Sequence, residues 1–475
     1  MSHRNKLFAF LMGMSLLYVL PVILADRPYI DDLGRSVLGY TWWGLNGRPL
    51  SDMVMIVLSM GSPILDLSPL TLLLGITILS LTLAAHIDKV MHNRSVKEKL
   101  LICFCFLANP FLLECLSYKF DSLTMLLSAA ILFVPFTVQA RVSLVWIVSV
   151  ICIISSLSLY QASIGIFVIL TFLECAFFVS GNKDIIKSAL SRAIQFGLGY
   201  VLYAKIVLPL SSGGDYVKNH SEFISLSDPD ELLQNIDRIS YIVRAYIESV
   251  PKVVIYLYAL MVFSSVALMF ISAIRNKQAA KAIIIISMPF AAALFSFLHI
   301  LLLKDAVMAP RVFISVSAFL LMNAMIVCNG FREFRYSYAL LIPFIFCSFS
   351  LSYAYGNALK HQKMMDENLA TSLSYDITNM NVMPSSISFI GAAPSAPQRD
   401  LAIKRMPIIK YLTPIYMRGD WVWGAKLLAY NGLNLTLRPI NGKVDVCSVV
   451  KRNSRYSIIE SGDRVIVSFD PNVCK

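Results

Sequence analysis

The chain has 475 residues, of which 57% are hydrophobic and only 15% are charged, and its mean hydropathy is +0.68. A soluble domain carries about 25% charged residues, so this composition excludes a soluble globular enzyme, a disordered protein and a fibrous protein. The formal net charge of +12 does not indicate a nucleic-acid partner, because the basic residues lie mainly between apolar blocks and in the tail. The composition therefore predicts a membrane protein with many spans.

About eleven apolar blocks follow one another, each of roughly 17–24 residues and long enough to cross a ~30 Å hydrocarbon core. Backbone polar groups within lipid must bond internally, so each block is expected to be a helix. The predicted spans are 7–24, 64–85, 100–116, 122–138, 143–160, 164–180, 193–210, 253–274, 282–303, 312–328 and 336–355. The predicted fold class is therefore an all-α polytopic membrane protein over residues 1–355.

The Lys and Arg residues of the short connecting segments predict the orientation, because cytoplasmic loops are enriched in both. They gather before the first span and after the second, sixth, eighth and tenth, which all lie on one side if there are eleven spans. The amino terminus is therefore predicted to be cytoplasmic and the tail to lie outside. The first span lacks an A-x-A cleavage pattern and is expected to remain as a helix. The predicted outer segments include 25–63, 211–250 and 304–311.

The tail, residues 356–475, has its own pattern. A short strand is predicted at 386–390 and a helix at 423–430, while 456–459 and 465–469 flank the turn sequence Ser-Gly-Asp, which is typical of a hairpin. These elements predict a small α/β domain outside the membrane. It holds half of the net positive charge, which could rest on anionic headgroups or serve only as a solubilising surface.

The cysteines divide between the two predicted parts. Seven of the nine lie in apolar spans, where a free thiol behaves as a small hydrophobic group. Cys447 and Cys474 lie in the outer domain, where an oxidising compartment would permit a disulfide; two unpaired thiols are the alternative. The sequence has no CxxC, GxGxxG or P-loop pattern, and its histidines are scattered, so neither structural zinc nor soluble nucleotide chemistry is expected.

The strongest catalytic candidates are Asp31 and Asp32, in the segment 27–35 directly after the first span. Adjacent carboxylates cannot both point the same way, so one could deprotonate an attacking sugar hydroxyl while the other holds the loop. The alternative is a solvated acidic turn that caps a helix. Trp42 and Trp43 follow, and they either stack on a sugar or isoprenoid or belong to an interfacial aromatic belt.

A second candidate is Tyr118-Lys119-Phe120-Asp121, in a very short outer turn. Lys119 and Asp121 either pair and mark the interface or shape the polar mouth of a site, because charge is tolerated at the membrane surface but costly at the bilayer centre. Tyr160 and Gln161, at a span end, are weaker candidates for substrate contact.

A third candidate is the outer loop that holds Lys304 and Arg311. The guanidinium of Arg311 is suited to a lipid phosphate, although an interfacial arginine can also simply extend toward water. In the tail, Trp421 and Trp423 either stack on carbohydrate or belong to the core of the outer domain.

The order of these short motifs resembles the O-antigen serotype-converting glucosyltransferase family of temperate phages and their enteric hosts. The resemblance covers most of the first 350 residues and is weaker in the tail. The motifs that carry it are Tyr29-Ile30-Asp31-Asp32 with Arg35, Gly39-Tyr40, Gly47-Arg48-Pro49-Leu50, Tyr118-Lys119-Phe120-Asp121-Ser122 and Tyr160-Gln161.

The resemblance implies a GT-C architecture in the bacterial inner membrane, with the tail in the periplasm. It implies transfer of glucose from undecaprenyl-phosphate glucose to O-antigen, with inversion at the anomeric carbon, and functional partners that make and flip the lipid-linked glucose. The expected phosphate ligands are Arg311, Lys304 and Lys119. The other expected substrate contacts are Arg35, Asp121, Tyr160 and Gln161.

In this mechanism Asp31 or Asp32 accepts the proton of the acceptor hydroxyl. A cofactor is not required, although Asp31, Asp32 and Asp121 could together hold one hard cation, Mg²⁺ or Mn²⁺, if their loops converge.

Two other functions stay open on the sequence. A transporter or flippase of lipid-linked sugar would also be polytopic and basic, but it should show internal repeats or broken helices with charges near midspan, and neither is clear here. An O-antigen polymerase or ligase would share the compartment, but its key basic residues are expected in a large middle loop. The segment 211–250 is instead mixed in charge and predicts an amphipathic helix.

Overall fold

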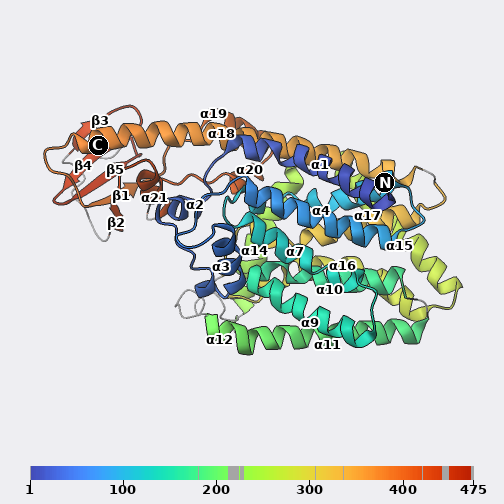
Figure 1. The fold of residues 1–475 in the computed structure, drawn as a ribbon. Coiled ribbons are helices and arrows are strands. Elements are labelled where there is room, and N and C mark those ends of the chain that lie inside the picture. The colour runs from blue at the N-terminus through green and yellow to red at the C-terminus, as the bar shows by residue number, and fades with distance from the viewer. Residues whose placement is uncertain are drawn as a thin grey trace.

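The molecule is a bundle of helices with a small sheet beyond one end, at the opposite end from the amino terminus (Figure 1). Its architecture comes from a computed structural model. The model describes residues 2–179, 181–211, 224, 229–304, 306–334, 336–419, 421–440 and 449–471. Cys447 and Cys474 lie outside these residues.

Eight helical segments in the described ranges are long and apolar enough to cross a membrane. They are α1 (His3–Ala25), α4 (Leu70–Val90), α9 (Val142–Leu159), the segment Asn182–Ser211 with α11 (Asn182–Leu202) and α12 (Leu208–Ser211), α15 (Lys252–Arg275), α16 (Ala279–Leu301), the segment Pro310–Gly330 with α17 (Val316–Gly330), and the segment Ser337–Thr378 with α18 (Ile342–Thr378). These helices confirm the prediction of a mostly helical membrane protein.

The three other predicted spans are also helical, but they are short or divided. The block 100–116 is split between α5 (Val96–Leu107) and α6 (Leu112–Ser117), because Pro110 cannot continue a helix. The block 122–138 forms α7 (Ser122–Ile131) and α8 (Val134–Thr137), and 164–180 forms α10 (Gly165–Phe177). The number of helices that cross the membrane therefore stays a prediction.

The predicted boundary at residue 355 falls inside α18, which continues without a break to Thr378. This helix packs along α1 and extends past the bundle to the sheet (Figure 1). The two helices approach closely at Gly356, where a Cβ would lie 2.5 Å from Pro21 Cβ. The bundle and the tail are thus joined by one continuous helix.

The sheet confirms that the tail forms a small α/β unit. Its five strands have the order β2-β1-β5-β4-β3, in which β1 is parallel to both neighbours and the other pairs are antiparallel. The strands are β1 (Ser386–Ile390), β2 (Thr436–Leu437), β3 (Val449–Arg452), β4 (Ser457–Ser461) and β5 (Arg464–Ser468). The predicted hairpin joins β4 and β5, and Gly462 in its turn has φ +65°, a conformation that glycine adopts without strain.

The remaining helices lie between the candidate membrane spans and in the tail. They are α2 (Asp32–Leu38), α3 (Pro49–Leu58), α14 (Pro229–Ser249), α19 (Pro397–Arg405), α20 (Ile409–Leu412) and α21 (Trp423–Tyr430). Leu33 of α2 is buried in the same apolar cluster as the sheet residues Ile387 and Val465. The helix that carries the Asp31–Asp32 pair therefore packs on the core of the tail.

Candidate active site

Asp32 is a buried carboxylate that joins the segment after α1 to the segment between α6 and α7. It accepts hydrogen bonds from the backbone N–H of Tyr29 at 2.9 Å, Lys119 at 2.9 Å and Phe120 at 3.3 Å. Burial raises the pKa of Asp32 to about 8, against the lowering effect of these hydrogen bonds. Since its oxygens are already bonded to the backbone, Asp32 is suited to holding the loops together rather than to taking a substrate proton.

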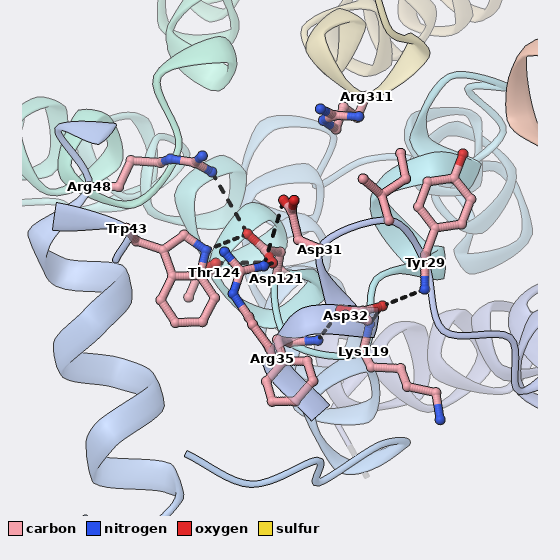
Figure 2. Close-up of polar contacts among 12 residues, drawn as sticks. Tyr29, Asp31, Asp32, Arg35, Trp43, Arg48, Lys119, Asp121, Thr124 and Arg311 are labelled. Carbon is pink, nitrogen blue, oxygen red and sulfur yellow. Dashed lines mark hydrogen bonds and ion pairs between the residues drawn. The ribbon is translucent and has the colours of Figure 1, made fainter. Parts of the chain in front are cut away.

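Asp31 points in a different direction from its neighbour, as expected for adjacent carboxylates. Its side chain remains 36% exposed, and its Oδ2 lies 3.7 Å from Arg35 Nη1. Figure 2 shows the carboxylate directed toward the side of the site where Arg48 and Arg311 lie. Asp31 is therefore the member of the pair that a substrate can reach.

Asp121 lies at the centre of the charged cluster. Its Oδ2 accepts a hydrogen bond from Arg35 Nη1 at 2.7 Å, and its Oδ1 accepts one from Trp43 Nε1 at 2.6 Å. Arg48 Nη1 forms an ion pair with Oδ1 at 3.8 Å (Figure 2). The Asp121 side chain is 3% exposed. Because an unpaired buried charge is costly, this carboxylate fixes the positions of both arginines.

The two adjacent tryptophans have opposite environments. Trp43 is fully buried, with the guanidinium of Arg35 4.1 Å from its ring centre, and its backbone N–H donates to Asp52 Oδ1 of α3. Trp42 is 60% exposed and stacks on Tyr40 with the ring centres 4.4 Å apart. Only Trp42 of this pair presents a ring face that could stack on a sugar.

Arg311 is held rigidly at the amino end of its helical segment. Its backbone N–H donates to Glu114 Oε2 and its Nη1 donates to Glu114 Oε1, each at 2.7 Å. The guanidinium also lies 5.5 Å from the ring centre of Tyr118, on the side of the site toward which the Asp31 carboxylate is directed (Figure 2). Within the described residues, Nε and Nη2 of Arg311 make no hydrogen bond, so they can meet an anion beside Asp31.

Arg48 is positioned by a chain of hydrogen bonds from the bundle. Gln161 Nε2 donates to Tyr203 Oη at 3.0 Å, and the Tyr203 hydroxyl donates to the carbonyl oxygen of Gly47 at 2.8 Å. The Arg48 guanidinium lies 5.6 Å from the ring centre of Tyr160. Gln161 thus supports the loop that carries Arg48.

Two buried hydroxyls accompany the arginines. The Oη atoms of Tyr118 and Tyr160 have no hydrogen-bond partner among the residues that the structure describes. Their rings lie under the guanidinium groups of Arg311 and Arg48, respectively. Buried polar groups are usually paired, so these hydroxyls are free to bind a ligand that enters between the arginines.

The two predicted lysine ligands differ in position from the arginines. Lys119 Nζ lies 2.6 Å from Asp26 and 3.2 Å from Asp66, and its side chain points away from Asp31 (Figure 2). Lys304 is exposed in a turn directly after α16. Arg48 and Arg311, rather than Lys119, lie on the side toward which the Asp31 carboxylate is directed (Figure 2).

The tryptophans of the tail belong to its apolar core. Trp421 and Trp423 are partly buried against the cluster that includes the sheet. The guanidinium of Arg418 lies 4.1 Å from the ring centre of Trp421. This arrangement favours the structural role over carbohydrate stacking.

The three carboxylates suggested as a cation site do not converge. Asp32 is directed at backbone N–H groups, and Asp121 at Arg35 and Trp43. Within the described part of the chain, no group of three His, Cys, Asp or Glu residues is arranged to hold a metal ion.

Several residues of the site were not singled out by the sequence. Arg48 appeared only as part of a resembling motif, and the roles of Glu114 and Tyr203 were not foreseen. Glu114 could have been found, because an acid inside an apolar block must have a partner. Tyr203 carried no such signal, because it is an uncharged residue inside the predicted span 193–210.

Comparison with known proteins identifies the family of this chain. The chain matches the family described as glucosyl transferase GtrII over residues 20–328, which include Asp31, Arg48, Asp121 and Arg311. It is also 28% identical, over 99% of each chain, to an uncharacterized 55.3 kDa protein in the gtrB 5′ region of Salmonella phage P22. No solved structure matches. The family match covers more than half of the chain, and the protein therefore belongs to the GtrII glucosyltransferase family.

Proposed function

We propose that this protein transfers glucose from undecaprenyl-phosphate glucose to O-antigen at the periplasmic face of the bacterial inner membrane. The observation that carries the proposal is the exposed Asp31 carboxylate, directed toward Arg48 and Arg311 at one end of an apolar helical bundle. A base beside cations is the arrangement needed to activate a hydroxyl next to a phosphate-linked sugar.

The reaction is a direct displacement at the anomeric carbon. The acceptor oxygen forms the new bond to that carbon while its proton passes to Asp31, and the bond from the carbon to the phosphate oxygen breaks. The electron pair of the broken bond stays on undecaprenyl phosphate, which leaves as a stable anion and needs no proton. Attack from the face opposite the phosphate inverts the anomeric configuration.

The donor phosphate is proposed to bind between Arg48 and Arg311, with the Tyr118 and Tyr160 hydroxyls as further donors. Both guanidinium groups are already oriented, by Asp121 and Glu114 respectively. Pre-oriented arginines lose little freedom on binding and match phosphate oxygens well. The isoprenoid chain would then lie along the apolar helices.

Replacing Arg48 with Gln is expected to raise KM for the lipid-linked donor by about 10- to 100-fold, because a hydrogen bond to a charged group contributes about 1.5–3 kcal/mol. The KM for the acceptor should change little. Steady-state kinetics with varied donor concentration measures both constants. The matched control is Arg438→Gln, which removes an exposed arginine of the tail; equal effects of the two variants would contradict the phosphate role.

Trp42, with Tyr40 beneath it, is proposed to stack on an acceptor sugar. Trp42→Ala is expected to raise the acceptor KM about 2- to 10-fold, because contacts of one aromatic face contribute about 0.5–1.5 kcal/mol. The donor KM should stay constant. Met60→Ala is the control, because Met60 is also an exposed apolar residue of the first outer loop with positive φ. If Met60→Ala raises the acceptor KM equally, membrane contact rather than sugar stacking explains the effect.

The proposed donor can be tested in cells that make an unmodified O-antigen. Co-expression of this protein with a lipid-glucose synthase and a flippase should add hexose to the O-antigen, detected by mass spectrometry of the released polysaccharide. Omission of the synthase should abolish the addition. Hexose addition without any lipid-linked glucose would overturn the assignment of the donor.

A further inference from the structure

We infer that Tyr416, in the tail, is a positioning residue that fixes the direction of Asp31 by clamping the backbone on either side of Tyr29, up to the amide of Ile30. The inference rests on the proposed function for the role of Asp31, but the clamp itself is a property of the fold. It makes the tail part of the active site rather than a separate module.

The first observation is the backbone of Ile30, directly before Asp31. Ile30 has φ +48°, in the left-handed region. A β-branched residue rarely adopts this conformation, because its Cβ substituents crowd the backbone. Such residues persist only where surrounding contacts hold them, and they gather at functional sites. The backbone turn at Ile30 directly precedes Asp31, so it sets the direction in which the chain enters Asp31.

The second observation is the hydroxyl of Tyr416. It accepts the backbone N–H of Ile30 at 3.2 Å and donates to the carbonyl oxygen of Pro28 at 2.8 Å. The Tyr416 ring is buried, and the guanidinium of Arg27 lies 4.3 Å from its centre. The Tyr416 hydroxyl of the tail therefore forms hydrogen bonds with the backbone at Pro28, before the turn, and at Ile30, within it.

Further contacts from the same part of the tail hold the start of the loop. Arg27 Nη2 donates to Asp366 Oδ2 and to the carbonyl oxygen of Pro414, each at 2.7 Å. The Tyr29 hydroxyl donates to the carbonyl oxygen of Leu412 at 2.9 Å. Residues 27–30 are thus bonded along one side to the segment 412–416 and to α18.

On the other side of Asp31, the loop is anchored to the bundle. Asp32 accepts backbone N–H bonds from Lys119 and Phe120. Asp31 therefore lies between an anchor on the tail and an anchor on the bundle. A general base must stay within hydrogen-bond reach of its proton, and a small displacement of a reacting group can lower the rate strongly. Loss of the tail anchor should misplace the base without removing any group that contacts substrate.

Tyr416→Phe tests this role in the full-length protein in proteoliposomes, because it keeps the buried ring and removes both hydrogen bonds. The expected result is a fall in kcat of about tenfold or more, with KM for donor and acceptor within about twofold of wild type. Tyr456→Phe is the matched control: Tyr456 is another buried tyrosine of the tail, and its hydroxyl donates to Asp376 at the far end of α18. An unchanged kcat in Tyr416→Phe, or an equal fall in Tyr456→Phe, would overturn the inference.

Hydrogen–deuterium exchange separates the clamp from the proposed reaction. Exchange of the amides in 26–33 should become faster in Tyr416→Phe and stay unchanged in Tyr456→Phe. This measurement needs no substrate, so it tests the clamp independently of the reaction. If wild type transferred nothing from lipid-linked glucose, that result would overturn the proposed function but not the clamp. Unchanged exchange in Tyr416→Phe would overturn the clamp.

A second substitution tests whether the clamp acts through Ile30. Glycine adopts a positive φ without the penalty of a side chain, so adding Ile30→Gly to Tyr416→Phe should make the reversed turn easier to keep. The double variant is expected to recover kcat at least about threefold over Tyr416→Phe. No recovery would contradict control of Asp31 through the Ile30 backbone.

Discussion

Replacement of Asp31 with Asn is expected to lower the rate of glucose transfer by about 10²- to 10⁴-fold, the usual contribution of a positioned general base. The amide has nearly the same shape but cannot accept the proton of the acceptor hydroxyl. Asp31 is partly exposed and its only ion pair in the described structure is with Arg35 at 3.7 Å, so the folded protein should be little affected. Initial rates with saturating donor and acceptor, together with thermal unfolding in detergent, measure both quantities.

The neighbouring substitution, Asp32→Asn, should behave differently. The Asp32 carboxylate accepts three backbone N–H bonds, and an amide offers one oxygen and an NH₂ group that cannot accept them. We therefore expect a lower unfolding temperature together with reduced transfer. If Asp32→Asn keeps wild-type stability while Asp31→Asn keeps wild-type transfer, the roles assigned to the two carboxylates are reversed.

Replacement of Asp121 with Asn is expected to have the largest effect on stability. It removes the buried negative charge that lies against Arg35 and Arg48, leaving the longer pair with Asp31, at 3.7 Å, as the remaining ion pair of Arg35 in the described structure. Breaking a buried ion pair by removal of one partner typically costs about 3–5 kcal/mol. Chemical unfolding in detergent micelles should show this loss in the free energy of unfolding, and transfer should fall because both arginines lose their positions.

The matched control for Asp121 is Glu333→Gln, which breaks an ion pair with Arg332 in which both side chains are largely exposed. Exposed pairs contribute little to stability, so this variant should unfold like wild type. Wild-type unfolding of Asp121→Asn would show that the cluster around this carboxylate does not hold the site together.

Much of the fold could be predicted, because its main signals are local. Hydropathy located the helices, and the sequence Ser-Gly-Asp located the β4–β5 hairpin. The breaks were harder to predict. Pro110 interrupts a block that is long and apolar enough to be one span. Helix α18 continues past the end of its apolar stretch because its later turns pack against the tail.

The site was predictable in composition but not in geometry. The sequence indicated that Asp31 and Asp32 diverge, but which one is buried depends on backbone N–H groups of Lys119 and Phe120, far along the chain. A distant residue also separates the two tryptophans: Asp121 accepts a hydrogen bond from the ring N–H of Trp43, which is buried, while Trp42 is exposed.

Long-range contacts explain the remaining differences. Lys119 looked suited to a phosphate, but Asp26 and Asp66 hold its ammonium group away from Asp31. The contact between Ile30 and Tyr416 joins residues 386 positions apart, and no local pattern in the sequence marks it. Tertiary packing decides such contacts, so they emerge only from the fold.

The most direct test of the central proposal uses the purified protein in proteoliposomes with radiolabelled undecaprenyl-phosphate glucose and O-antigen. Wild type is predicted to move the label to the O-antigen and to leave a labelled sugar nucleotide unused, while Asp31→Asn transfers almost nothing. Transfer at the wild-type rate by Asp31→Asn, or transfer by wild type from the sugar nucleotide alone, would contradict it.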